Sequence, residues 1–340
     1  FRRVLFRSAL GVVGTAIGWV SLFFPFGRDQ GLYHYVAREW IYNGSLPYRD
    51  VLDHKTPGIY VLNAIAILLF GKTMWGIRAV DMVGVLLVSL VAASFAAPRG
   101  EAPAPGVCGA TIIGTNLLYF GHLDFWNSAQ SELWYSLLGL ASVAAVRRLA
   151  RDHVAFAVGG LAAGAAMVMK PPSGWFVLVA FGVLVIRLLE RRERLAKRAV
   201  QAVALFGVGS AVVPASVIGY FAMHDNALGD MIDVVVGANA YYVKHETDVH
   251  SLGDALEKLW VLLRYFNPVG TITVLGGVCT LALGLARGDR PLRDRSILAL
   301  VLFLAGVLAV SMQKKFFLLH YVATLGPYGV LVANLAATCH

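Results

Sequence analysis

Long apolar segments, separated by short polar breaks, occupy most of the chain. A membrane-spanning helix needs roughly 20 mostly apolar residues, with a range of about 17–25. Segments close to that length lie at 9–27, 75–97, 106–121, 131–147, 154–170, 174–189, 199–222, 266–286, 296–312 and 320–338. Two longer polar stretches interrupt them, at 28–57 and 223–258. The pattern predicts an all-α polytopic membrane protein with about ten spans and no soluble domain.

The segment 58–71 is apolar but only 14 residues long. That length is short for a span and typical of an interfacial or re-entrant helix. If the segment does not span, four breaks share one side of the membrane: 98–105, 147–153, 187–198 and 287–295. These breaks hold 14 basic residues against six acidic ones, while the other side holds 12 basic residues against 14 acidic ones. Because cytoplasmic loops carry the excess of Lys and Arg, we place 58–71 at the outer surface of the cytoplasmic (inner) membrane.

Composition supports the membrane class, since 58% of the residues are hydrophobic and only 14% are charged. Soluble proteins carry about 25% charged residues. The formal net charge of +9 could indicate nucleic-acid binding. The topology already accounts for the basic residues, so we expect no nucleic-acid partner. The three cysteines have neither disulfide nor metal spacing.

We interpret both ends of the sequence as artificial. The chain begins FRRVLFRS, at residues 1–8, which can be back-translated into a common sequencing-adapter sequence. We therefore expect 1–8 to be an assembly scar; the alternative, a basic cytoplasmic tail, leaves the topology unchanged. The sequence NLAATCH ends at the edge of an apolar helix, so we expect a truncated C-terminus. The transmembrane domain then covers 9–338.

Four polar elements fall on the predicted outer face: the opening stretch 28–57, then 122–131, 223–258 and 313–320. Seven of the nine histidines lie on them, at His34, His54, His122, His224, His245, His250 and His320. This concentration predicts a site at the outer face. Its main parts are a catalytic loop with interfacial helices over 28–74 and a second large loop over 223–258.

Asp29 directly follows the first span and opens a segment whose apolar residues have helical spacing. A helix stop follows at Asn43-Gly44. Asp29 suits a helix N-cap, where its carboxylate would accept hydrogen bonds from free backbone amides. It also suits a general base just outside the membrane. The two roles are compatible.

The run Leu46–Gly58, which contains Tyr48, Asp53 and His54, predicts an extended approach to a helix that begins near Pro57. Lys55 and the amide end of that helix would form an anion site at the level of the lipid headgroups. The alternative is that Lys55 and Arg49 pair with Asp50, Asp53 or lipid phosphates.

Further charged residues lie at the outer ends of later spans. Asp124 suits loop polarity or substrate binding, and Glu132, inside a span, needs a partner or a cavity. Lys314 and Lys315, followed by His320, place positive charge against the inside bias, which favours phosphate binding over snorkelling. The remaining expectations are an ion pair between Arg78 and Asp81, a tight turn at Lys170-Pro171-Pro172, and no strong metal pattern in His245–His250.

The opening stretch resembles the polyprenyl-phosphate-dependent glycosyltransferases of the GT-C fold, in the family-39 group that includes protein O-mannosyltransferases and the lipid A aminoarabinose transferase. The matching residues are Asp29; Gly44, Pro47, Tyr48 and Asp50; Asp53, Lys55 and Pro57; Leu69, Phe70 and Gly71; and Arg78. The match is specific over about 27–80 and looser to 135. Two departures occur: Gln30 stands where the family often has Glu, and Thr56 replaces a Pro.

The resemblance implies inverting transfer of a sugar from a polyprenyl-phosphate donor to an acceptor hydroxyl, with Asp29 as the catalytic base. Lys55 would hold the lipid phosphate, helped by Lys314, Lys315 or Lys170, and Asp124 would orient the acceptor or sugar. No cofactor or metal is required, although the acidic residues leave a divalent ion open. The acceptor could be a protein, a lipid or a wall polymer of the cell envelope. The alternative is a transporter or lipid flippase for an anionic substrate.

Overall fold

The computed structural model describes residues 15–190, 195–224, 226–245, 249, 251–265 and 269–339. Its elements are η1 (Ile17–Phe23), α2 (Arg28–Asn43), α3 (Gly58–Phe70), α4 (Met74–Ser94), α5 (Pro105–Phe120), α6 (Ser131–Arg148), α7 (Asp152–Met169), η2 (Pro171–Ser173), α8 (Gly174–Glu190), α9 (Leu195–Ala222), α10 (Ala227–Ile232), η3 (Asp233–Ala238), α11 (Asn239–His245), α12 (Leu252–Tyr265), α13 (Val269–Ala286), α14 (Arg290–Met312), η4 (Leu318–Thr324) and α15 (Leu325–Thr338). Strand-like pairing in these residues amounts to one isolated bridge between Pro47 and Val51. The predicted all-α class is confirmed.

Six helical segments of the described chain are long and apolar enough to cross a membrane. They are α4, α7, η2 with α8, α9, α14, and η4 with α15. The expected ten spans are therefore too many by this criterion. Helix α5 has 16 residues, the apolar part of α13 is similarly short, and α6 contains Glu132, Arg147 and Arg148. The predicted span 9–27 falls partly outside the described residues, and its described part includes the 3-10 helix η1.

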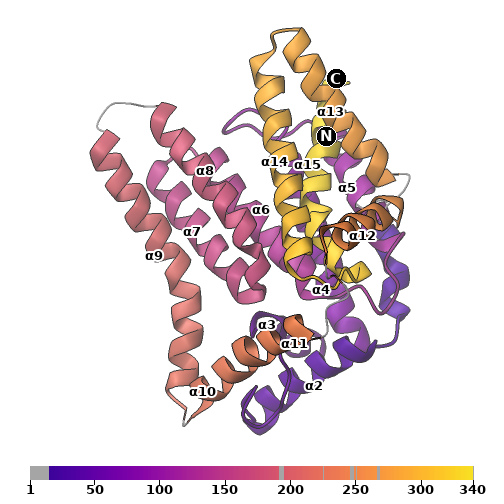
Figure 1. The fold of residues 1–340 in the computed structure, drawn as a ribbon, viewed down its shortest axis with the longest axis vertical. Coiled ribbons are helices and arrows are strands. Elements are labelled where there is room, and N and C mark those ends of the chain that lie inside the picture. Colours follow the sequence, from indigo (N-terminus) through magenta and orange to yellow (C-terminus); the bar gives the residue numbers. More distant parts are fainter. Residues whose placement is uncertain are drawn as a thin grey trace.

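The polar elements gather at one end of the helix bundle. Figure 1 shows α2, α3, α10 and α11 together at the lower end of the view. Helix α3 has 13 residues, about 20 Å at 1.5 Å per residue, so it is too short for a hydrocarbon core of about 30 Å. The polar stretch 223–258, expected as a loop, instead contains α10, η3, α11 and the start of α12. We call this end the α2–α3 end.

The opposite end of the bundle is rich in arginine. Figure 1 shows the end of α8 and the turn between α13 and α14 at the top of the view, away from α2 and α3. Arg99, Arg147, Arg187 and Arg295, one from each break, line the same cavity. The four breaks therefore share one end, as the charge count predicts, and we call it the arginine-rich end.

Small residues allow the helices to approach closely. A Cβ atom on Gly160 or Gly164 of α7 would meet the carbonyl oxygens of Phe206 and Ser210 on α9. The backbones of α7 and α9 are thus in contact, as is common where glycine lies between membrane helices. This packing fixes the position of α7, whose last turn precedes Lys170.

Arg78 and Asp81 do not form the expected ion pair. The buried Arg78 guanidinium donates to Ser128 Oγ at 2.5 Å, Phe125 O at 2.8 Å and Pro25 O at 3.0 Å. Asp81 Oδ2 instead accepts from Tyr119 Oη at 2.8 Å. Because a guanidinium presents several donors in a fixed fork, Arg78 can hold the α5–α6 connection against the segment that leads into α2.

Candidate functional site

Glu132 and Lys170 form a buried ion pair at the centre of the site. Glu132 lies in the first turn of α6, and Lys170 follows the last residue of α7. The Lys170 ammonium donates to Glu132 Oε1, and the two side chains are 17% and 1% exposed. Burial lowers the pKa of Lys170, an effect that the Glu132 carboxylate opposes. The pair supplies the partner that Glu132 needs, and the sequence had not identified it.

The segment that carries Lys55 is attached to the same place. Thr56 Oγ1 donates to the carbonyl oxygen of Met169 at 2.5 Å. A Cβ atom on Gly58 would lie 2.9 Å from both Met169 Cα and Val168 O, so only glycine lets the start of α3 lie this close to α7. These contacts place Lys55 within electrostatic range of Lys170.

The backbone around Lys55 is held by buried hydroxyl groups. Tyr60 Oη donates to Asp53 Oδ2 at 2.9 Å, and Tyr48 Oη donates to the Lys55 carbonyl oxygen at 2.7 Å. Tyr48 itself has φ 75°, a left-handed conformation that is unfavourable for a bulky residue. Asn239 of α11 donates to the His54 carbonyl oxygen at 2.7 Å. The side chains of Tyr48 and Asp53 therefore help to fix the backbone conformation of the segment that carries Lys55.

His54 lies beside the Asp53 carboxylate. Its Nδ1 atom is 3.4 Å from Asp53 Oδ1, and its side chain is 41% exposed. Burial lowers the pKa of His54, and the neighbouring Lys55 charge lowers it further, while Asp53 acts in the opposite direction.

Lys55 is half-buried and, among the described residues, forms no ion pair or side-chain hydrogen bond. The sequence left open a pairing with Asp50 or Asp53. In the structure Arg49 pairs with Asp50 at 2.9 Å, and Asp53 is occupied by Tyr60 and His54. The Lys55 charge is therefore available to an anion from outside the protein.

The connection between α14 and α15 brings further basic residues. Lys315 is 9% exposed and His320 is 6% exposed, whereas Lys314 is exposed and has φ 54°. The charges of Lys170, Glu132, Lys55 and Lys315 all act on His320. His320 Nδ1 is buried with no hydrogen-bond partner among the described residues. Of the two predicted lysines, Lys315 belongs to the cluster and Lys314 lies at the surface.

Asp29 lies in the first turn of α2, and Gly27, rather than Asp29, is the N-cap residue. The N-cap interpretation of Asp29 is therefore wrong. Its carboxylate is 32% exposed, and its nearest charged partner is the highly exposed Arg28, at 3.7 Å. The Asp29 charge acts on Tyr33, His54 and Lys170. Asp29 is thus a partly exposed carboxylate at the edge of the cluster.

Asp124 has a structural part in the α5–α6 connection. Its Oδ1 atom accepts from Trp126 N at 2.9 Å, Asn127 N at 3.0 Å and Asn127 Nδ2 at 2.8 Å. This is a local turn in which the side chain satisfies the backbone. A contact between Asp124 and a sugar or acceptor stays a prediction.

A metal centre was not expected in the 223–258 stretch. Within the described ranges no group of three or more His, Cys, Asp or Glu side chains is placed to hold a metal ion. Within the stretch His245–His250 (HETDVH), His245 ends α11. Residues 246–248 and 250 lie outside the described residues.

Glu132 and Lys170 are the site members that sequence reasoning underused. One signal was present: both Glu132 and Lys170 fall at the end of a predicted span on the same side of the membrane. An acid and a base at such positions can pair when their helices are neighbours. Helices α6 and α7 pack against each other, which brings Glu132 and Lys170 together.

Comparison with known proteins finds similarity in structure alone. Neither the models of known protein families nor the curated proteins give a match. The fold is similar to the crystal structure of ArnT from Cupriavidus metallidurans in the apo state, with a TM-score of 0.61 and 18% identity. It is also similar to the same protein bound to undecaprenyl phosphate, with a TM-score of 0.59 and 17% identity. Each match covers 98% of this chain and 59% of the other, so the chain spans about three fifths of the length of ArnT.

Proposed function

We propose that this chain is the membrane domain of an inverting glycosyltransferase that moves a sugar from a polyprenyl-phosphate donor to an acceptor hydroxyl. The observation that carries the proposal is the convergence of Lys55, Lys170, Lys315 and His320 beside Asp29. These residues come from four separate parts of the chain, and electrostatic interactions connect them. Such a cluster combines an anion site with a carboxylate base.

The basic residues suit the lipid phosphate that leaves in the reaction. Glu132 neutralises Lys170, whereas Lys55 forms no ion pair among the described residues and adds positive charge to the cluster. A charge in a partly buried site is worth several times more than the same charge in water. Fixed cations stabilise the charge that develops on the leaving phosphate, and a phosphate leaves without help from a general acid.

Asp29 suits the base. Its carboxylate is accessible, lies in the first turn of α2 and is within electrostatic range of the cations. In the proposed step it accepts the proton of the acceptor hydroxyl while the hydroxyl oxygen bonds to the anomeric carbon. The bond between the anomeric carbon and the phosphate oxygen breaks on the opposite face, and the lipid phosphate leaves with the electron pair. Attack from that face inverts the anomeric configuration.

The similarity to ArnT supports the class of donor. One of the matching ArnT structures holds undecaprenyl phosphate, a polyprenyl phosphate. The resemblance of the stretch 27–80 to polyprenyl-phosphate glycosyltransferases supports the same class independently, because it rests on sequence motifs. On the charge pattern, the α2–α3 end faces outward from the cytoplasmic membrane.

The test uses the full-length protein purified in lipid nanodiscs. It is given a panel of radiolabelled polyprenyl-phosphate sugars together with envelope lipids and peptides as acceptors. The proposal expects a glycoside whose anomeric configuration, read by NMR, is the inverse of that of the donor. A product of retained configuration would contradict the proposed step. Movement of the donor across vesicle membranes with no glycoside formed would favour the transporter alternative.

A further inference from the structure

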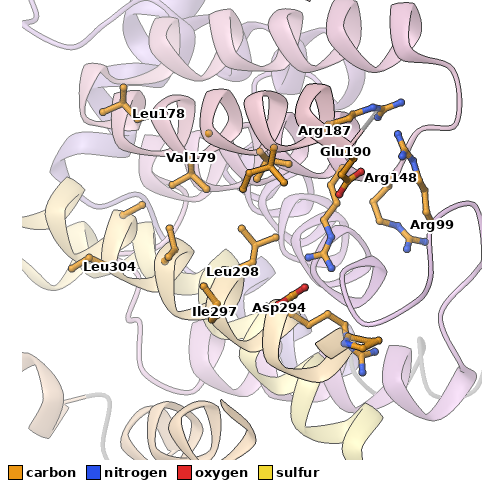
Figure 2. Close-up of a pocket in the computed structure, with 18 of the residues that line it drawn as sticks. Arg99, Arg148, Leu178, Val179, Arg187, Glu190, Asp294, Ile297, Leu298 and Leu304 are labelled. Atoms are coloured by element: carbon orange, nitrogen blue, oxygen red, sulfur yellow. The ribbon is translucent and has the colours of Figure 1, made fainter. Parts of the chain in front are cut away.

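A large cavity extends between α8 and α14 from the arginine-rich end of the bundle (Figure 2). Its volume is about 1220 Å³. Sites for drug-sized molecules usually measure about 300–1,000 Å³. Along the two helices its wall is apolar, with Leu178 and Val179 facing Leu298 and Leu304. The cavity therefore suits an occupant with a long apolar part.

One end of the cavity is strongly basic. Five arginines line it against two acids: Arg99, Arg147, Arg148, Arg187 and Arg295 against Glu190 and Asp294. Two of the arginines are fully engaged in structure. Arg148 donates to the carbonyl oxygens of Ala97, Pro98 and Glu101, and Arg187 pairs with Asp152 at 2.5 Å.

Arg147 and Arg295 each have N–H donors that form no hydrogen bond within the described residues. Arg147 lies over the Phe95 ring at 5.7 Å and, among the described residues, makes no hydrogen bond or ion pair. Arg295 uses one Nη atom on the Ala96 carbonyl at 2.6 Å, but its buried Nε has no partner there. Arg148 and Arg295 also repel Arg147, because like charges lie close together. The unpaired buried Nε of Arg295, next to the half-buried Arg147 guanidinium, indicates an anion as the missing partner.

The length and apolar lining of the cavity indicate that the ligand also has a long apolar part. On α8 it extends from Glu190 to Trp175, and on α14 from Asp294 to Leu308. At 1.5 Å per residue each wall is about 20 Å long, well into a hydrocarbon core of about 30 Å. Leu178 is 61% exposed and Leu304 is 55% exposed, so the wall is open toward the space that the lipid chains fill.

We propose that this cavity binds one anionic glycerophospholipid, with its phosphate held by Arg147 and Arg295 and its acyl chains lying between α8 and α14. Basic pockets between membrane helices bind such headgroups. The arginines that would hold the phosphate lie at the opposite end of the bundle from Asp29 and Lys55, so a lipid whose phosphate sits there cannot present a sugar to that cluster. The lipid is thus a separate, resident ligand, and its binding does not depend on the proposed glycosyl transfer.

The test counts lipids that stay bound to the full-length protein. Protein from nanodiscs of phosphatidylcholine with a minority of phosphatidylglycerol is released into detergent, and retained lipids are identified by native mass spectrometry. Two variants probe the two halves of the site. Arg147→Gln removes the unpaired charge, and Gly182→Phe fills the apolar part, where a Cβ on Gly182 meets nothing within 4 Å. The matched controls are Arg287→Gln, an exposed arginine outside the cavity lining, and Gly207→Phe, an exposed and equally open position on α9.

The wild-type protein is expected to retain phosphatidylglycerol in preference to phosphatidylcholine. Loss of a charge-assisted hydrogen bond should lower retention in Arg147→Gln roughly tenfold. Gly182→Phe should also lose the lipid, and both controls should keep it. Equal retention by all variants, no preference for the anionic lipid, or a cavity filled by another part of the full-length chain overturns the proposal. An Asp29→Asn protein that loses glycosyl transfer should still retain the lipid, so the two proposals fail separately.

Discussion

Two lysines of the cluster should respond in opposite ways to the same substitution. Lys55 has no ion-pair partner among the described residues, whereas Lys170 is paired with the buried Glu132 carboxylate. Lys55→Met should therefore weaken binding of a lipid phosphate and leave the fold intact. Lys170→Met should destabilise the fold, because it leaves the Glu132 charge buried and alone.

The magnitudes follow from the surroundings of each ammonium group. Breaking a buried ion pair by removing one partner costs about 3–5 kcal/mol. Since 1 kcal/mol shifts Tm by about 2–4 °C in domains of 150–250 residues, Lys170→Met should lower Tm by on the order of 10 °C. A charge-assisted hydrogen bond to phosphate is worth about 1.5–3 kcal/mol, so Lys55→Met should weaken binding roughly 10- to 100-fold. Lys55→Met should not lower Tm, because Lys55 repels Lys170 in the folded state.

The assay combines thermal unfolding in detergent with competition by undecaprenyl phosphate against a labelled donor. Lys55→Arg keeps the charge and should restore most of the binding. Glu132→Gln combined with Lys170→Met removes both buried charges and should recover most of the lost stability. A Lys55→Met protein that binds the lipid phosphate normally, or that unfolds as early as Lys170→Met, would refute the reasoning.

Three further predictions concern the frame of the site. Gly58→Val places its side chain against Met169 and Val168 O; it should destabilise the protein by about 1–3 kcal/mol and reduce transfer, while Gly229→Val, at an open position on α10, should change neither. Burial and the Lys55 charge lower the pKa of His54, so the folded protein binds fewer protons at His54 than the unfolded chain does. Stability should therefore fall as the pH drops from 6.5 through the lowered pKa of the folded state. A flatter profile of Tm against pH in His54→Asn would confirm this. Arg78→Lys cannot reach Ser128, Phe125 and Pro25 together; transfer should fall although Asp29 and Lys55 are intact, and normal transfer would exclude Arg78 as a positioning residue.

Local patterns were sufficient to predict the helical class and the helices α2 and α3, but not α10 and α11. The short apolar length of 58–71, taken with the charge count, predicted a helix that does not span, and α3 has 13 residues there. The run around Lys55 and Pro57 predicted a cation just before a helix, and α3 begins at Gly58. These features depend on neighbours in the sequence, so spacing and charge suffice to find them.

Pairings between distant segments could not be predicted in this way. Glu132 and Lys170 meet because α6 packs on α7, and no local pattern specifies that packing. Arg78 and Asp81 have the spacing of an ion pair on one helix, but the carbonyl oxygens of Phe125 and Pro25 compete more effectively for the Arg78 guanidinium. Lys315 turns inward while Lys314 does not, in a segment where both Lys314 and Phe316 have positive φ values. A sequence of two adjacent lysines does not encode that difference.

The central claim is that Asp29 is the base of a sugar transfer from a polyprenyl phosphate, and one rate measurement tests it most directly. Initial rates of glycoside formation are compared for full-length wild-type, Asp29→Asn and Asp233→Asn proteins at equal expression, Asp233 being an exposed acid at the same end of the bundle. General-base catalysis contributes about 10²- to 10⁴-fold, so Asp29→Asn should lower the rate at least 100-fold while Asp233→Asn keeps the wild-type rate. A wild-type rate in Asp29→Asn would contradict the claim.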